Sequence, residues 1–242
     1  MVDAAKLGKW IQPQHLLEEN LARYRESFTR HPAKLVIVED FLLGDVAERI
    51  SAFLAGEALF EEEHGLYSTH GAVSREDWES AADDDRLFRL SRLKGISPEH
   101  MMSPNAVTYL RLRQSLQQPE FRGFFEALTG LEFGSSDDFG VHSMSVGDFL
   151  RAHSDDLRNR SIAFVMYLSP GWRPSYGGAL HMVDETGAES QIEATYNSIV
   201  VFDVQAENSH LVAPIEPAAG ETRRLTIGGW YPTPAGADSP RA

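Results

Sequence analysis

Apolar positions in the first half of the chain recur every three or four residues, which is the spacing of an amphipathic helix. The predicted helices span residues 14–30, 44–60, 104–118 and 119–129. Pro119 separates the last two, and Gly130 closes the final one. A short apolar run at residues 34–42 is typical of a buried strand instead. We therefore expect residues 1–130 to form a mostly helical part with one strand, which packs on the second half of the chain.

The segment from Glu61 to Gly95 is polar and rich in charges, and it interrupts this helical pattern. Its one clear helix start is at Ser74, which precedes an arginine and two acidic residues. We expect a long, partly ordered excursion, with residues 61–86 as a lid loop over a functional site, because long polar loops near a site often close on substrate. A disordered surface loop is the alternative.

From about residue 131 the pattern changes to short β-branched or aromatic runs punctuated by Gly, Pro, Asn and Asp. The predicted strands span residues 138–146, 149–153, 161–169, 178–184, 197–204, 210–216 and 223–231. Such runs are typical of an antiparallel β-barrel or jelly roll. We expect residues 131–232 to form this barrel, residues 233–242 to be a flexible tail, and the whole chain to be a single domain of the α+β, mainly β class.

Composition excludes several kinds of protein. The chain of 242 residues has no cysteine, so disulfides, thiolate metal sites and cysteine nucleophiles are excluded, and any metal must bind His, Asp or Glu. No apolar run approaches the roughly 20 residues of a membrane helix, and the first residues lack the apolar core of a signal peptide. We expect a cytoplasmic protein without a membrane partner. A net charge of −14 disfavours nucleic acid as a partner.

Two residues on one predicted strand could bind a metal ion. His153 and Asp155 are two residues apart, so both side chains project from the same face of an extended strand. The pair alone is weak evidence, since nine histidines and 36 acidic residues in 242 positions give about one such pair by chance. His210 opens another predicted strand and could converge with them inside a barrel. Two histidines and one carboxylate on one face of an octahedral ion are the arrangement of iron(II) oxygenases, whereas zinc usually closes tetrahedrally.

The last predicted strand adds a candidate anion site. Alternating positions of this strand should face the barrel interior, and they hold Arg224, Thr226, Gly228 and Trp230. A buried arginine needs a fixed anion, and its planar fork suits a carboxylate such as the distal carboxylate of 2-oxoglutarate. Gly228 would leave room for that ligand, and Tyr167 on another strand could donate a phenolic hydrogen bond to it.

Together these residues resemble the prolyl-4-hydroxylase-like branch of the iron(II)/2-oxoglutarate-dependent oxygenase superfamily. The resemblance covers roughly residues 138–232 and rests on GDFLRAHSD, on YLSPGWRPSYGGALHM, on His210 followed by Pro214, and on RRLTIGGWY. It implies a double-stranded β-helix, a jelly-roll or cupin-like barrel with supporting N-terminal helices. It also implies a hydroxylase that uses Fe(II), 2-oxoglutarate and O2 to oxidise an unactivated C–H bond of a prolyl or other peptidyl residue, with release of succinate and CO2.

The resemblance implies a role for several individual residues. His153, Asp155 and His210 would be the iron ligands, Arg224 the partner of the distal carboxylate, and Tyr167 its neighbour. Arg224 is preferred to Arg223 because it stands six residues before Trp230, and adjacent strand residues face opposite ways. Thr226 is a further candidate cosubstrate contact. The candidates for substrate contacts or for neighbours of the ligands are His142, Met144, Arg151, His181 and Trp230.

The chain departs from the family pattern at Met144, flanked by His142, where the family often has a tyrosine. This departure removes one expected cosubstrate contact. Asp155 disfavours halogenation, because related halogenases have a small residue there. Two other functions stay open from the sequence: oxidation of a free amino acid or small metabolite by the same chemistry, and a cupin-like metal or ligand binding module without turnover. The sequence does not indicate the oligomeric state.

Overall fold

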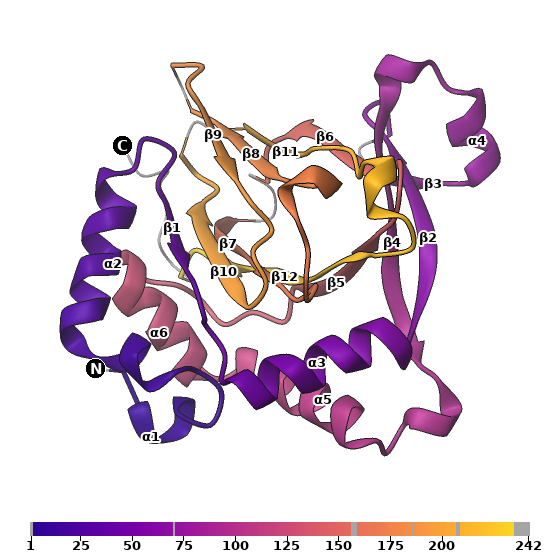
Figure 1. The fold of residues 1–242 in the computed structure, drawn as a ribbon. Helices are drawn as coiled ribbons and strands as arrows, with labels where there is room; N and C mark the ends of the chain where they lie inside the picture. Colours follow the sequence, from indigo (N-terminus) through magenta and orange to yellow (C-terminus); the bar gives the residue numbers. More distant parts are fainter. Residues whose placement is uncertain (1, 70, 156–158, 185, 207–208, 235–242) are drawn as a thin grey trace.

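The computed structural model describes residues 2–69, 71–155, 159–184, 186–206 and 209–234, with helices packed on one side of a curled sheet (Figure 1). The helices are α1 (Ala4–Leu7), α2 (Glu18–Arg30), α3 (Gly44–Gly56), α4 (Arg75–Ser80), α5 (Pro104–Leu116) and α6 (Pro119–Thr129). The strands are β1 (Leu35–Val38), β2 (Ala58–Leu66), β3 (Gly71–Val73), β4 (Arg86–Ile96), β5 (Phe139–Met144), β6 (Phe149–His153), β7 (Arg160–Tyr167), β8 (Leu180–Val183), β9 (Glu189–Ile192), β10 (Ser198–Asp203), β11 (Ser209–Val212) and β12 (Arg224–Pro232).

The strands form one antiparallel sheet in the order β1-β10-β7-β12-β5-β4-β6-β11-β8-β9, with β2 paired to β4 and β3 paired to β2. The sheet curls on itself, so that residues of β8 and β11 pack against residues of β7 and β10 in one core. This arrangement is the double-stranded β-helix expected from the resemblance.

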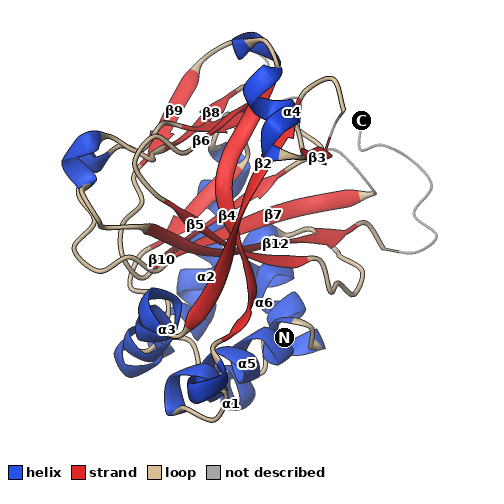
Figure 2. Ribbon diagram, turned by 90° about the vertical axis from the view of Figure 1, so that its right-hand side faces the viewer, coloured by secondary structure: helices blue, strands red, loops and turns tan. Residues whose placement is uncertain are grey.

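Strand β12 separates two cores. Leu225, Ile227 and Tyr231 belong to the core shared with the helices, where the rings of Phe125 and Phe164 stack with centroids 5.1 Å apart. Side chains at the intervening positions face the barrel interior. Helices α1, α2, α3, α5 and α6 lie on the outer side of β12, and α4 lies apart from them (Figure 2).

Most helices predicted from the sequence are confirmed. Glu18 begins α2, after a 3-10 turn at Pro13–Leu16, and a left-handed Gly130 (φ 78°) ends α6. Helix α3 ends at Gly56 rather than residue 60, because β2 starts two residues later. None of the described helices is long and apolar enough to cross a membrane.

The expectation of a single strand and a loop over residues 61–86 is wrong. Residues 58–96 form an arm of β2, β3, α4 and β4, in which β2 and β4 pair over their whole length (Figure 2). Charged residues that pair across the two strands stand where apolar residues would alternate with polar ones, as in the ion pairs of Glu63 with Arg92 and of Glu61 with Lys94. The sequence therefore lacks the two-residue alternation that predicts a strand. The predicted start of α4 is confirmed, since the Ser74 side chain accepts from Asp77 N–H.

All seven strands predicted after residue 131 are present, and β9 is an additional strand where the sequence predicts a turn. Glu189–Ile192 is a short edge strand of alternating exposed positions, which gives little apolar signal. Residues 235–242, most of the predicted tail, lie outside the described residues.

Candidate metal centre and anion pocket

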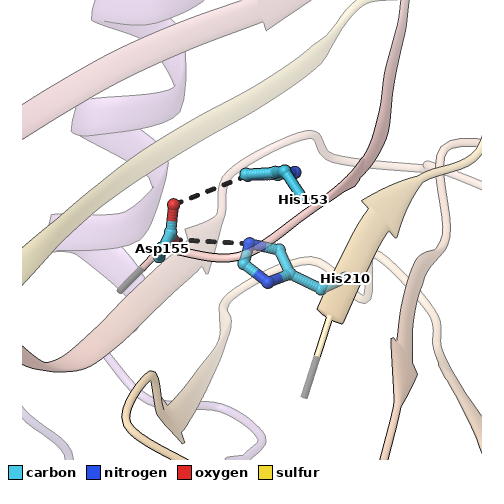
Figure 3. Close-up of side chains that lie close together, drawn as sticks. All are labelled: His153, Asp155 and His210. Carbon is cyan, nitrogen blue, oxygen red and sulfur yellow. Dashed lines mark ion pairs between the residues drawn. The ribbon is translucent and has the colours of Figure 1, made fainter. Parts of the chain in front are cut away.

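Two neighbouring strands bring two histidines face to face. His153 ends β6 and is the register partner of His210 in β11, and their ring centroids lie 4.2 Å apart. Asp155 reaches both rings, with Oδ1 3.5 Å from His153 Nε2 and Oδ2 3.4 Å from His210 Nε2 (Figure 3). One nitrogen or oxygen atom from each residue lies within 4.8 Å of the others, so a single ion could contact all three.

Surrounding groups orient this cluster. His153 Nδ1 lies 2.9 Å from the carbonyl oxygen of Arg151, to which it donates, so the Nε2 lone pair is left for a metal. The indole N–H of Trp230 donates to Asp155 Oδ2 at 2.8 Å. The Arg160 guanidinium carbon lies 3.6 Å from the centroid of the Trp230 ring, and its Nη1 is 3.8 Å from Asp155 Oδ1. Asp155 is therefore held in place by neighbours on β7 and β12.

Burial and mutual attraction set the charges of the cluster. Burial disfavours ionised Asp155, but hydrogen bonds from His153 and His210 outweigh it and hold the pKa of the carboxyl below its usual range. Burial also opposes protonation of His153, yet the hydrogen bond to Asp155 prevails and raises its pKa. At His210 burial dominates and lowers the pKa. An ionised carboxylate beside two imidazoles is a suitable donor set for a divalent transition metal.

Arg224 lies inside the barrel without an anion. It is 4% exposed, and among the described residues no carboxylate pairs with it. Neither its Nε nor the Tyr167 hydroxyl has a hydrogen-bond partner in the described part of the chain, although the guanidinium carbon lies 5.0 Å from the Tyr167 ring centroid. Gly178 (φ 70°) makes room, since a Cβ there would lie 2.8 Å from Arg224 Cδ. A buried cation and hydroxyl without partners are costly, so this pocket is built for an anion.

The register places the pocket on one inner wall. Thr226 pairs with Tyr167 on β7 and with His142 on β5, while Arg224 pairs with Met144, whose sulfur lies 3.7 Å from Arg224 Nη1. These five residues share a face, as the alternation predicted for the last strand indicated.

Gly228 also allows a close approach between strands. A Cβ at this position would lie 3.1 Å from the carbonyl oxygen of Phe164. The glycine therefore accommodates the neighbouring strand β7, and the room that it would leave for a ligand stays a prediction.

The side chains of two other candidates, Arg151 and His181, pair away from the cluster, so they do not contact the ligands; a contact with substrate stays a prediction. The Arg151 guanidinium pairs with Asp83 of the arm, Nη2 to Oδ2 at 2.9 Å, and only its carbonyl touches His153. His181 pairs with Glu189 on the adjacent strand, since its neighbour Met182 takes the inward position.

Sequence reasoning did not single out Arg160. Its side chain pairs with Asp138 at 2.8 Å as well as approaching Asp155 and Trp230. The one available signal was a cation at the start of the mostly apolar run 161–168, and two of its partners, Asp138 and Trp230, are distant in the sequence.

A comparison with known protein families gives a match over the part of the chain that contains the candidate metal and anion-binding residues. The family model described as the 2OG-Fe(II) oxygenase superfamily matches residues 139–232, which contain the His-Asp-His cluster, Tyr167 and Arg224. The barrel is similar to this superfamily over these residues, and we refer to it below as the oxygenase barrel. The name of the superfamily specifies 2-oxoglutarate and iron(II), the two groups for which the inner wall has a pocket and a ligand set.

The relatives of this oxygenase barrel include prolyl hydroxylases. Prolyl 3-hydroxylase OGFOD1 of Mus musculus is 31% identical over 128 residues, which are 50% of this chain and 23% of the relative. Prolyl 3,4-dihydroxylase OGFOD1 of Ostreococcus tauri is 31% identical over 150 residues, 57% of this chain and 28% of that protein. The chain thus spans about a quarter of the length of the curated relatives it matches.

Solved structures share the fold of the oxygenase barrel and its helices. A Pseudomonas putida prolyl-4-hydroxylase aligns with a TM-score of 0.56 at 23% identity, over 88% of this chain and 98% of its own. A Trichoplax adhaerens prolyl hydroxylase in complex with a hypoxia-inducible factor peptide aligns with a TM-score of 0.61 at 15% identity, over 91% and 93%.

The residues of the oxygenase barrel fit iron(II) and 2-oxoglutarate. The donor set of His153, Asp155 and His210 is that of a non-haem iron site. The unpartnered Arg224 Nε and Tyr167 hydroxyl fit a carboxylate, which can accept from both at once.

Replacing Trp230 with phenylalanine is expected to weaken metal binding by the oxygenase barrel about tenfold, because Asp155 loses the donor that orients it. Anaerobic iron(II) titration measures the effect. Trp172→Phe is the matched control, since the Trp172 indole N–H donates to the Gly177 carbonyl instead. Equal metal affinity of wild type and Trp230→Phe would show that Asp155 needs no such partner.

Proposed function

We propose that this chain is a non-haem iron(II)- and 2-oxoglutarate-dependent dioxygenase that hydroxylates an unactivated C–H bond of a peptidyl prolyl residue and releases succinate and CO2. The observation that carries the proposal is a buried arginine without an anion in the same barrel as a three-ligand cluster. Three protein ligands leave positions on an octahedral ion for a cosubstrate and O2. The prolyl substrate is supported by the names of the relatives.

Each residue of the inner wall has a part in this function. His153, Asp155 and His210 would hold the iron, and Arg224 with Tyr167 would receive the distal carboxylate of the cosubstrate. When bound, iron(II) and 2-oxoglutarate would supply the electrons that activate O2, which is the oxidant for the C–H bond of the substrate. The protein orients the groups and keeps water away from them.

The environment of the site supports this division of work. Met144, Tyr167 and other buried side chains surround Arg224, so water is excluded from the anion pocket. Trp230 and Arg160, which touch Asp155, also line an open pocket of about 390 Å³ together with Ser136 and Asp138. We propose this pocket as the approach for the substrate.

Incubation with iron(II), 2-oxoglutarate, O2 and prolyl peptides is expected to yield succinate together with a peptide heavier by one oxygen atom. Neutral and basic peptides are the first choice, because the chain carries a net charge of −14. Mass spectrometry of the peptide and a coupled assay of succinate measure the two products in one reaction.

The same peptides with alanine in place of proline serve as controls. Succinate formed equally with both peptide sets, or formed only with free amino acids or small metabolites, would contradict a peptidyl prolyl substrate and favour the small-molecule oxygenase. Absence of any succinate across both classes would favour a binding module without turnover.

We also propose a cytoplasmic location, which the absence of cysteine permits. Detection of the protein in fractionated cells of its source tests this, and its recovery from a secreted or membrane fraction would contradict it.

A further inference from the structure

His142 occupies the middle of the inner wall. Its cross-strand neighbours are Thr226 on one side and Arg92 of the arm on the other, and Tyr167 lies one strand beyond Thr226. Four polar side chains therefore form one row across β7, β12, β5 and β4. Among the described residues, neither ring nitrogen of His142 has a hydrogen-bond partner.

The charged groups that act on this ring come from both the anion pocket and the metal centre. Burial lowers the pKa of His142 to about 4, reinforced by the positive charges of Arg92 and Arg224 and opposed by Asp155. The ring is thus within electrostatic reach of both Arg224 and a metal ligand. Near pH 7 it is neutral, so it keeps one N–H donor and one acceptor nitrogen.

The orientation of the ring favours the metal end. Along β12, Arg224 marks the anion pocket, and Trp230, which donates to Asp155, marks the metal centre. His142 pairs with Thr226 but leans toward Gly140, where a Cβ would lie 3.2 Å from its Cε1 and 3.4 Å from its Nε2. Gly140 pairs with Gly228, which lies between Thr226 and Trp230. The His142 ring is therefore tilted from the level of Thr226 toward the metal centre.

We propose that His142 is a cosubstrate-positioning residue, whose ring N–H donates a hydrogen bond to the metal-proximal end of 2-oxoglutarate, opposite the end taken by Arg224. This inference rests on the proposed function. Met144 on the same strand face has only a thioether, which cannot donate a hydrogen bond. His142 is therefore the residue of β5 that donates a hydrogen bond to the cosubstrate.

Binding measurements without turnover test this role. Iron(II)-loaded protein is titrated anaerobically by calorimetry with 2-oxoglutarate, and separately with oxalate, which keeps the metal-proximal oxygens but lacks a distal carboxylate. His142→Leu is expected to weaken both ligands roughly 10- to 100-fold, as for loss of a hydrogen bond to a charged group. His142→Gln restores most of the affinity, because its amide nitrogen can donate from a position close to that of the ring Nε2. Arg224→Ala weakens 2-oxoglutarate but not oxalate.

His181→Leu is the matched control, because that histidine pairs with Glu189 away from the interior, and its affinities should equal those of wild type. Wild-type affinity of His142→Leu for both ligands would overturn the proposal, as would His142→Gln binding no better than His142→Leu. A loss for 2-oxoglutarate alone would overturn the assignment to the metal-proximal end. Failure of the proposed function is distinguishable, since wild type would then bind no 2-oxoglutarate. Thermal unfolding and iron content verify that each variant is folded and loaded.

Discussion

Replacement of Arg224 with alanine is expected to weaken 2-oxoglutarate binding by about 100-fold or more, the cost of leaving a buried carboxylate without its cation. Iron(II) binding should stay as in wild type, because the guanidinium touches Tyr167 and Met144 and none of the three ligands. Anaerobic calorimetry with each ligand in turn separates the two effects. Thermal unfolding should show the same loss of binding, because 2-oxoglutarate with iron is expected to raise the Tm of wild type but not that of the variant.

Two further variants make this result specific. Arg223→Ala changes the adjacent arginine, whose guanidinium donates to the Ala55 carbonyl and stacks on Phe60 outside the barrel, and it should leave 2-oxoglutarate binding unchanged. Arg224→Lys keeps the charge but loses the planar fork, so an intermediate affinity is expected. Unchanged affinity of Arg224→Ala would show that the anion pocket is not the cosubstrate site.

Asp155→Ala is expected to abolish iron(II) binding at micromolar metal, with a loss greater than the roughly 10- to 100-fold typical of removing an outer hydrogen-bonding partner. Asp155 is the one carboxylate of the cluster and the group that both imidazoles approach. Without it the two histidines offer only neutral donors to a hard divalent ion. Metal content after dialysis, measured by atomic absorption, gives the answer directly.

Asp137→Asn is a suitable control for this change, because Asp137 is exposed on the loop before β5 and should not affect iron content. Loss of bound 2-oxoglutarate should accompany the loss of metal in Asp155→Ala, whereas Arg224→Ala loses the cosubstrate alone. Retention of stoichiometric iron by Asp155→Ala would contradict the assignment of this residue as a ligand.

The barrel could be predicted from sequence because period-two alternation survives on its strands. In β12 the odd-numbered residues pack against the helices and the even-numbered ones face the interior, so the position of Arg224 inside the barrel followed from strand geometry. The convergence of His153 with His210 also follows from two strand-borne positions, although only the resemblance indicated that β6 and β11 are neighbours.

The arm could not be predicted in the same way. Its long strands carry glutamates, arginines and a lysine at positions that pair across β2 and β4, so hydrophobic alternation gave no strand signal. The outward orientation of His181 follows from its neighbour Met182, which takes the inward position. The contacts of Arg160 depend on Asp138, which is more than twenty residues away in the sequence. Such features are set by tertiary packing and leave no local pattern.

The arm is also tied to the strand that carries a ligand. The Tyr67 hydroxyl donates to the Ala152 carbonyl at 2.8 Å, and Asp83 forms an ion pair with Arg151. These two contacts hold the residues immediately before His153. A peptide that pushed the arm aside would therefore pull on the backbone of a proposed iron ligand. Binding of a partner at the arm and binding of the metal inside the barrel are therefore mechanically linked through residues 151–153.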